Sequence, residues 1–199
     1  MPQDPKSPQH KNQRPAAPAH GAVNGVAANS ALTRRRPNRR ITEYGKQLRE
    51  KQKVKELYGL REKQFKNYVE KAMKYTGHVE EALVNILEQR LDNAVYRMGM
   101  SPTRRGARQL VSHAHFMVNG RPVNIPSFQV RAGDVIAMKP RGNQSPYFKE
   151  RQVLLKKFST PQWIVLNKEK MEAKVVGHPD TKDLAQFANL ALIFEFYSR

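Results

Sequence analysis

The amino-acid sequence predicts an α+β fold, with helices in the first part of the folded chain and short strands after them. Two observations predict it. Between residues 42 and 98, apolar side chains recur every three or four positions, which is the period of a helix with one buried face. After residue 115, short apolar runs are separated by turn sequences such as Asn119-Gly120, which is the pattern of antiparallel strands.

Capping residues predict where the helices begin and end. The first helix is expected to begin at Thr42, whose hydroxyl group can accept a hydrogen bond from the first turn, and to stop at Gly59. A second helix is expected over about 62–75. The third has the most regular apolar spacing in the chain, over 79–98, and Gly99 ends it.

A fourth helix is expected after Ser101, with Ser101 as its N-cap and Pro102 at the first helical position. The strands that we expect next form a hairpin with a tight Asn-Gly turn, followed by a third strand after a second turn. The remaining elements are a helix, two strands, a short helix and a last strand. In order, these segments are 116–118, 121–123, 135–139, 145–158, 163–166, 171–176, 183–190 and 193–197.

The net charge of the chain indicates which class of partner it binds. The 36 Lys and Arg residues against 17 Asp and Glu give a formal net charge of +19. Such a chain repels itself, and binding a polyanion relieves the repulsion. Nucleic acid is the commonest such partner, because each neutralised phosphate releases a counterion. An anionic membrane is the alternative, although no apolar run approaches the roughly 20 residues of a spanning helix.

The absence of cysteine excludes disulfides, cysteine-ligated zinc, iron–sulfur clusters and thiol catalysis. No apolar signal-peptide core begins the chain, so a cytoplasmic location is the default expectation. Residues 1–40 hold six of the 13 prolines and no aromatic residue, which predicts a disordered segment. It ends in a basic cluster that is either a solvated tail or, as we favour, an arm that orders on RNA: Arg34, Arg35, Arg36, Arg39 and Arg40.

Arginines occupy the start of the fourth expected helix, where acidic residues are usual because a helix N-terminus carries partial positive charge. Arg104 and Arg105 lie in its first turn, and Arg108 is four residues after Arg104, on the same helix face. We expect Arg104 and Arg108 to be exposed and to bind phosphate together with free backbone N–H groups. An ordinary solvated basic face is the alternative.

Two further groups of residues could in principle act in catalysis or bind a metal. Asp92 lies between Arg90 and Arg97, off the apolar stripe, and we interpret it as orienting these arginines by ion pairing rather than as a catalytic acid. His113 and His115 are too few for a zinc site, which needs three or four ligands. We therefore expect both imidazole side chains to face solvent or RNA and to bind no metal. Aromatic residues at helical spacing are more consistent with core packing than with base stacking: Tyr44, Tyr58, Phe65 and Tyr68.

Several motifs resemble one known family. The segments 90–92, 96–99, 103–104, 107–111, 118–121 and 133–136 (RLD, YRMG, TR, ARQLV, VNGR and GDVI) resemble the RNA-binding module named after small-subunit ribosomal protein four. The segments 44–54 and 61–65 (YGKQLREKQKV and REKQF) resemble the helical domain of that family in bacteria and organelles. Trp163, Met171-Glu172 and the segment 195–198 (EFYS) match its C-terminal part, so the resemblance runs from about Ile41 to the C-terminus.

The resemblance implies two folded domains. One is a mostly helical rRNA-binding domain with a small C-terminal sheet, formed by 41–87 with 150–199. The other is an inserted small α/β RNA-binding module over 88–149. It further implies a primary binder of small-subunit ribosomal RNA that nucleates assembly of the subunit body and contributes to translational accuracy. The implied partners are that RNA, neighbouring proteins including protein five, and messenger RNA on its way into the subunit.

The residues expected to bind RNA combine the basic patches with the matched motifs. Beyond the arginines of the arm they are Lys46, Arg49, Lys51, Lys53, Arg90, Arg97, Thr103, Arg104, Arg105, Arg108, Gln109, Asn119 and Arg121. No catalytic residue, metal ligand or cofactor is expected, and the location is cytoplasmic and ribosome-bound, with an organelle open. One departure is notable. Many bacterial members begin with a compact segment that sometimes holds zinc, and the Cys-free arm stands in its place.

Rival interpretations place the same module in another protein. An RNA-modifying enzyme or synthetase fragment would need a separate catalytic domain, for which the chain after Asp134 leaves little room. A stand-alone stress or chaperone-type RNA binder would lack the helical domain at 41–87. A membrane-surface role would need basic and aromatic residues on one lipid-facing helix, and they do not segregate in that way.

Overall fold

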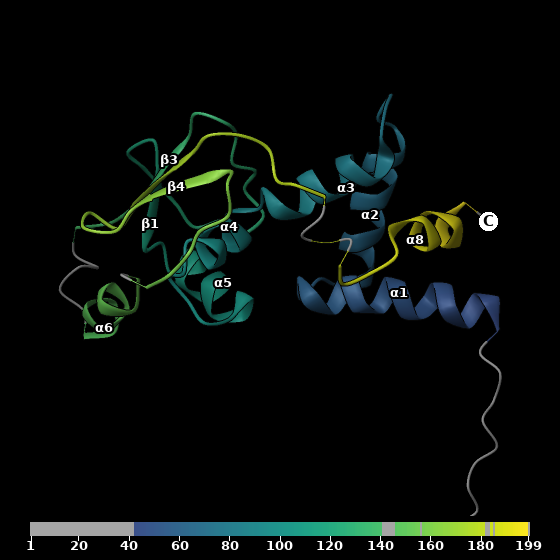
Figure 1. Cartoon of the computed structure of the whole chain (residues 1–199), viewed down its shortest axis with the longest axis horizontal. Coiled ribbons are helices and arrows are strands. Elements are labelled where there is room, and N and C mark those ends of the chain that lie inside the picture. Colours follow the sequence, from purple (N-terminus) through teal and green to yellow (C-terminus); the bar gives the residue numbers. More distant parts are fainter. Residues whose placement is uncertain (1–41, 141–145, 156, 182–183, 185, 199) are drawn as a thin grey trace, which may run out of the picture. The chain divides into compact units, whose positions relative to one another are not determined.

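Helices and one antiparallel sheet form the part of the chain that the structure describes (Figure 1). The structure is a computed structural model that describes residues 42–140 and 146–198, except 156, 182–183 and 185. All of these lie within one unit, Arg40–Arg199. In chain order the elements are α1 (Glu43–Leu57), α2 (Glu62–Met73), α3 (Val79–Glu88), α4 (Leu91–Arg97), α5 (Arg104–Ser112), β1 (Phe116–Val118), β2 (Arg121–Val123), β3 (Val135–Met138), α6 (Pro146–Leu155), β4 (Ile164–Asn167), β5 (Glu172–Val175) and α8 (Leu190–Tyr197).

Four helices, α1, α2, α3 and α8, share a hydrophobic core, and we call them the helical body. The apolar positions of α2 and α3 recur at three-residue to four-residue spacing and are fully buried, as at Phe65, Val69, Leu83 and Leu87. From α8, Ile193 completes the core. The C-terminal segment therefore packs against helices that lie more than a hundred residues earlier in the chain.

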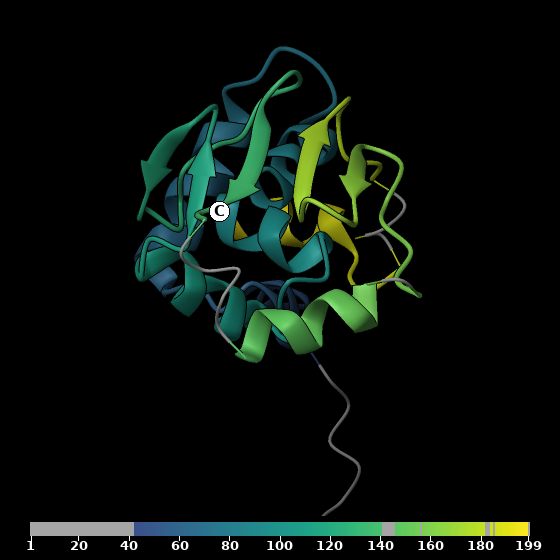
Figure 2. The same cartoon turned by 90° about the vertical axis from the view of Figure 1, so that its left-hand side faces the viewer.

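The second core lies under the sheet, and we call α4, α5, α6 and the five strands the sheet body. The strand order is β2-β1-β3-β5-β4, with every neighbouring pair antiparallel. In Figure 2 the strands lie in front of α4, and the green helix α6 lies below the sheet. Alternate strand residues such as Phe116 and Ile136 point into the core, where they meet Leu91 and Val95 of α4 and Trp163.

The predicted α+β class, mostly helical with a small sheet, is confirmed, but the sheet differs from the expectation. Strands β4 and β5 do not form a separate C-terminal sheet, because β5 pairs with β3 at Ile136↔Ala173 and so extends the sheet of the module. Phe148, Leu155 and Trp163 lie in the core of the sheet body. Residues 150–175 therefore pack with the module and not, as expected, with the helical domain.

The helix expected over 79–98 is broken at Gln89-Arg90. Arg90 has an extended backbone (φ −65°, ψ 137°) and forms an antiparallel bridge with Gln129. The segment after β2 provides the reason, since Leu91 N–H donates to the carbonyl of Phe128 at 2.8 Å and Val130 N–H donates to that of Gln89 at 2.8 Å. These bonds replace the helical ones, and no Gly or Pro marks the break in the sequence.

The fourth helix begins two residues later than expected. Its N-cap is Thr103, whose Oγ1 accepts from Gly106 N–H at 3.1 Å, and its first helical residue is Arg104. Ser101, the expected cap, is buried and donates from its hydroxyl group to the carbonyl of Thr103 at 3.0 Å. The N-cap of α1, by contrast, is Thr42 as predicted, and its Oγ1 accepts from Gly45 N–H at 3.2 Å.

The last element, α8, is a helix where a strand over 193–197 was expected. Leu190 and Ile193 are buried, and Phe194 and Tyr197 pack beside them, so the apolar side chains follow the helical period. The alternation of Phe194 and Phe196 around Glu195 resembles a strand in isolation. Contact of α8 with α1 decides between the two patterns. The short helix expected over 183–190 lies partly outside the described residues.

Glu62 joins α1, α2 and α8, and its ionisation makes the stability of the fold depend on pH. Burial opposes its ionisation, but hydrogen bonds from Lys51, Lys55 and Tyr197 outweigh burial and lower the pKa of Glu62 to about 2. A depressed carboxyl pKa stabilises the fold above the ordinary value of 4.5 and loses that contribution as pH falls towards about 2. We expect the melting temperature of the Glu62→Gln variant to lie below that of the wild type at pH 6, and the difference to shrink below pH 4.5. A difference that stays constant in circular dichroism melts down the pH series would contradict this assignment.

Candidate nucleic-acid interface

Glu88, the last residue of α3, is a buried acid around which basic and polar groups gather. Its carboxylate is 1% exposed and accepts two hydrogen bonds from Arg97, both 2.9 Å long, and one from Asn93 at 2.8 Å. The hydroxyl group of Tyr58 also donates to it. Burial acts to raise the pKa of Glu88, but these bonds and the charge of Arg97 outweigh it, so its pKa is lowered and the group stays ionised.

Asp92, in the first turn of α4, is a second buried acid. Arg90 donates to its two oxygens at 3.1 and 2.7 Å, and Arg108 donates to it at 2.8 Å. The remaining amine of Arg90 donates to the hydroxyl oxygen of Tyr68 at 2.6 Å. The interpretation that Asp92 orients arginines is supported, although its second partner is Arg108 rather than Arg97.

Two arginines of α5 tie the sheet body to the helical body. Arg108 donates to the carbonyl oxygens of Tyr58 at 2.7 Å and Gly59 at 2.6 Å, just after α1. Arg104 donates to Asn93 at 2.8 Å, and its guanidinium carbon lies 4.9 Å from the ring centre of Tyr58 and 4.5 Å from that of Tyr96. Cation–π contacts of this kind stabilise partly desolvated guanidinium groups.

The expectation that Arg104 and Arg108 form an exposed guanidinium pair is therefore wrong. Their side chains are 16% and 31% exposed, and both are engaged with protein groups. Arg90 is 2% exposed and Arg97 is 21% exposed. The spacing along α5 correctly places Arg104 and Arg108 on one helix face, but that face meets buried acids and carbonyl groups. Whether these arginines also contact RNA stays a prediction.

The other expected RNA-binding residues differ in exposure. Lys51 is buried, because it pairs with Glu62 and its ammonium group lies 4.5 Å from the ring centre of Phe196. Asn119 holds the hairpin turn, where its amide donates to Asp134 at 2.8 Å. The exposed members of the set are Lys46, Arg49, Lys53, Thr103, Arg105, Gln109, Asn119 and Arg121. The arginines at 34–36, 39 and 40 lie outside the described residues.

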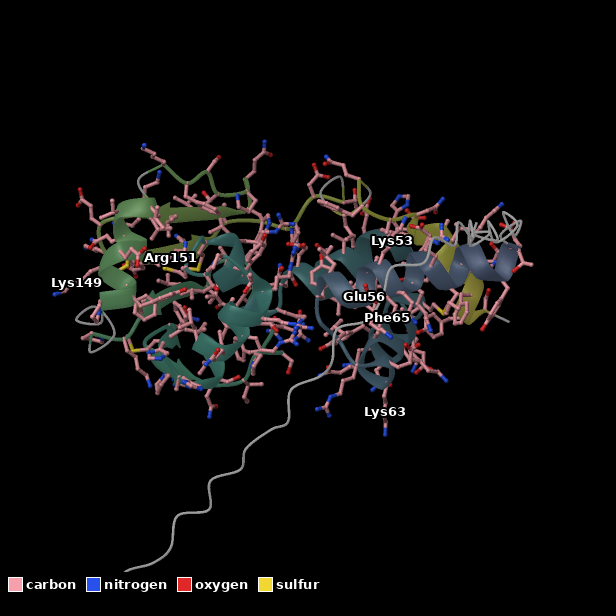
Figure 3. All side chains as sticks on the ribbon, turned by 90° about the horizontal axis from the view of Figure 1, so that it is seen from below. Lys53, Glu56, Lys63, Phe65, Lys149 and Arg151 are labelled. Carbon is pink, nitrogen blue, oxygen red and sulfur yellow. The ribbon has the colours of Figure 1, made fainter. Side chains whose placement is uncertain are left out.

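A basic groove opens beside the network, between α2 and the turn at 125–128, and we call it the α2 groove. Its volume is about 530 Å³. Arg61 and Lys63 line it from the start of α2 and make no ion pair with described residues, and Lys63 projects away from the ribbon (Figure 3). The full lining is Gly59, Arg61, Lys63, Gln64, Asn67, Arg90, Arg108, Pro126 and Ser127, none of which is acidic.

A second hollow of about 260 Å³ shares Gly59 and Arg108 with the α2 groove. Its lining includes Arg104 and Arg105 of α5 and the carboxylate-bearing Glu56 of α1. Of these, Arg105 is exposed and makes no ion pair with another described residue. Exposed cations suit phosphate groups, and the backbone that carries them is already fixed by buried ion pairs before a ligand binds.

The sequence reasoning missed four polar residues of α2 and its approach, namely Arg61, Lys63, Gln64 and Asn67. A signal was present, since none of them belongs to the apolar stripe of Phe65, Val69 and Ala72. In the sequence, the segment 61–65 indicated only a family resemblance and not a binding surface. What the sequence could not show is the turn at 125–128, which makes this helix face one wall of a groove.

The described residues give little support for metal binding or for a membrane span. No three His, Asp or Glu side chains there are placed to share a metal ion. The rings of His113 and His115 lie 6.2 Å apart, and burial together with the neighbouring His113 and Lys139 lowers the pKa of His115. Every helix in the described ranges is too short or too polar to span a bilayer.

Comparison with known proteins decides the family. The family model described as "S4 domain" matches residues 89–136, and that described as "Ribosomal protein S4/S9 N-terminal domain" matches residues 11–88. The chain belongs to the ribosomal protein S4 family. The second match begins at residue 11, so the family likeness reaches into the segment that we expected to be a distinct arm.

Relatives in the S4 family are similar over most of their length. The small ribosomal subunit protein uS4 of Halothermothrix orenii is 51% identical over 158 residues, which cover 79% of this chain and 76% of the relative. The proteins of the same name from Polaromonas naphthalenivorans and Thermodesulfovibrio yellowstonii are 48% and 47% identical, each over 80% of this chain and 77% of the relative. A structural ribosomal role in the small subunit follows from this family.

Proposed function

We propose that this chain is a primary binder of small-subunit ribosomal RNA that nucleates assembly of the subunit body and contributes to translational accuracy. It acts by binding and not by catalysis, and it works bound to the ribosome, in the cytoplasm or in an organelle. Its family and the net charge of +19 support an RNA partner. The roles in assembly and in accuracy are those that the family resemblance implies, and the geometry of the basic surface supports a folded RNA as the partner.

The observation that carries the proposal is the α2 groove next to the exposed cations of α5. Arg61, Lys63 and Arg105 are free to neutralise phosphates, while Arg90 and Arg108 are held in place by Asp92. The bodies on which these cations lie are joined by the hydrogen bonds of Arg108 to Tyr58 and Gly59. Cations on two joined bodies can contact two RNA segments at once, which suits a helix junction. Shape of the folded RNA then supplies most of the specificity.

We also propose protein neighbours, protein five among them, and messenger RNA passing nearby on its way into the subunit. A groove of about 760 Å³ between the α2–α3 turn and α8 supports a protein contact. Apolar Met73, Val79 and Phe194 line it, and Glu80 and Glu81 make its rim acidic. This rim repels phosphate, so the groove fits a basic protein better than RNA.

We expect the purified chain to bind folded small-subunit RNA more tightly than random RNA of equal length, with an affinity that falls steeply with salt. Each phosphate neutralised adds about 0.7–0.9 to the slope of log K against log salt concentration, so six contacts would give a slope of about 4–5. Filter binding across a potassium chloride series measures both quantities. Equal affinity for the two RNAs would contradict the proposal, as would failure to sediment with small subunits in a sucrose gradient of cell lysate.

A further inference from the structure

Two neutral amide side chains face the α2 groove among its cations. Gln64 and Asn67 are three residues apart on α2, so they lie on the same helix face. Both are exposed, and neither side chain makes a hydrogen bond with a described residue. Each amide offers two N–H donors and one carbonyl acceptor to a ligand. Within the described structure, these side chains make no hydrogen bond that would stabilise the fold.

The opposite wall of the groove is the turn at 125–128, whose backbone is fixed by three hydrogen bonds. Asp92 N–H donates to the carbonyl of Pro126 at 3.1 Å, Leu91 N–H donates to that of Phe128 at 2.8 Å, and Phe128 N–H donates to that of Ile125 at 3.1 Å. Pro126 and Ser127 line the groove from this side. The two walls are therefore in place before any ligand binds.

Cationic side chains line the same groove. Arg108 uses three of its five N–H donors in hydrogen bonds to Asp92, Tyr58 and Gly59, and its other two N–H groups have no partner among the described residues. Arg61 and Lys63 stand at the start of α2 beside the amides. The groove thus combines groups that suit a phosphate with groups that suit the hydrogen-bonding edge of a base.

We propose that the α2 groove holds one unpaired nucleotide of the bound RNA, with its phosphate on Arg61, Lys63 and Arg108 and its base edge read by Gln64 and Asn67. This inference rests on the proposed RNA-binding function and adds a base-specific contact to it. A volume of about 530 Å³ lies within the range of sites that bind small molecules. An intact A-form helix presents phosphates, 2′-hydroxyl groups and the shallow edges of its minor groove, but its stacked bases cannot enter the groove. An unpaired nucleotide can insert its whole base.

Salt dependence separates base reading from charge neutralisation. Amides displace no counterion, so we expect the Gln64→Ala/Asn67→Ala double variant to bind folded small-subunit RNA about tenfold more weakly with an unchanged salt slope. The Arg61→Ala/Lys63→Ala double variant should instead lower the slope, by up to about 1.8 if both residues neutralise a phosphate. Gln162→Ala removes an exposed amide of the sheet body and serves as the matched control, with wild-type affinity expected.

Chemical probing of the RNA locates the contact. Dimethyl sulfate and a carbodiimide modify base edges that are unpaired and uncovered. With wild-type protein and with Gln162→Ala, we expect protection of one unpaired base that the amide double variant leaves reactive, while the rest of the footprint is unchanged. Full affinity of the amide variant, a changed salt slope, or an identical footprint would overturn the inference and leave the proposed function standing. Failure of the wild type to prefer folded RNA would overturn both.

Discussion

Replacing Asp92 with alanine is expected to lower the free energy of unfolding by about 3–5 kcal/mol, because the change leaves a buried guanidinium group without its counter-charge. Arg90 is 2% exposed and makes both of its ionic hydrogen bonds to this carboxylate. Arg108 loses one of its three bonds at the same time. Urea unfolding followed by circular dichroism measures the change, with the midpoint as the readout.

Two further variants make this result specific to the buried pair. Glu150→Ala removes an exposed acid of α6 that makes no ion pair with another described residue, and should change stability by less than about 0.5 kcal/mol. Asp92→Asn keeps a hydrogen-bonding group of the same size but removes the charge, and should lie between the wild type and Asp92→Ala. If Asp92→Ala unfolded at the same midpoint as Glu150→Ala, the carboxylate would not be a structural anchor.

Local features of the fold were predictable because they depend on neighbouring residues. The cap at Thr42 and the tight turn at Asn119-Gly120 follow from side-chain chemistry and from positive φ angles within four residues. The break at Gln89-Arg90 was not predictable, because its cause is pairing with a segment about forty residues later. Helix α8 was missed for the same reason, since its packing against α1 selects the helical pattern.

The basic residues of the site were predictable as a set, but their division into buried and exposed members was not. The sequence identified Arg90, Arg97, Arg104 and Arg108, and Asp92 as a partner of Arg90. It did not show that Glu88 pairs with Arg97 and Arg104, or that Asp92 also pairs with Arg108. Except for Arg90 and Asp92, which are two residues apart, an acid and its arginine partner here come from different elements, up to sixteen residues apart. Such pairs are made by tertiary packing, so only the structure separates the arginines that hold the fold from those free to bind phosphate.

The second large effect is expected for the Arg104→Ala/Arg108→Ala variant. It should destabilise the fold, and its RNA affinity should fall as a consequence. Together these side chains make the hydrogen bonds to Asp92, Asn93 and the carbonyl groups of 58 and 59, along with two cation–π contacts. Charge-assisted hydrogen bonds contribute about 1.5–3 kcal/mol each, and their losses are not additive. We expect the double variant to lose about 3–5 kcal/mol of unfolding free energy, and to bind RNA more weakly because the bonds from α5 to the end of α1 are lost. Thermal melts and filter binding on the same preparation measure the two effects.

The matched variant Arg61→Ala/Arg105→Ala removes the same number of charges from the same surface without touching the network. Both residues are exposed and make no ion pair with described residues, so unfolding free energy should change by less than about 1 kcal/mol. RNA affinity should nonetheless fall, and the salt slope should drop by up to about 1.8. The comparison holds net charge constant, so a difference in stability between the two double variants must come from buried contacts. Equal melting temperatures would show that α5 is not tied to α1 through Arg104 and Arg108.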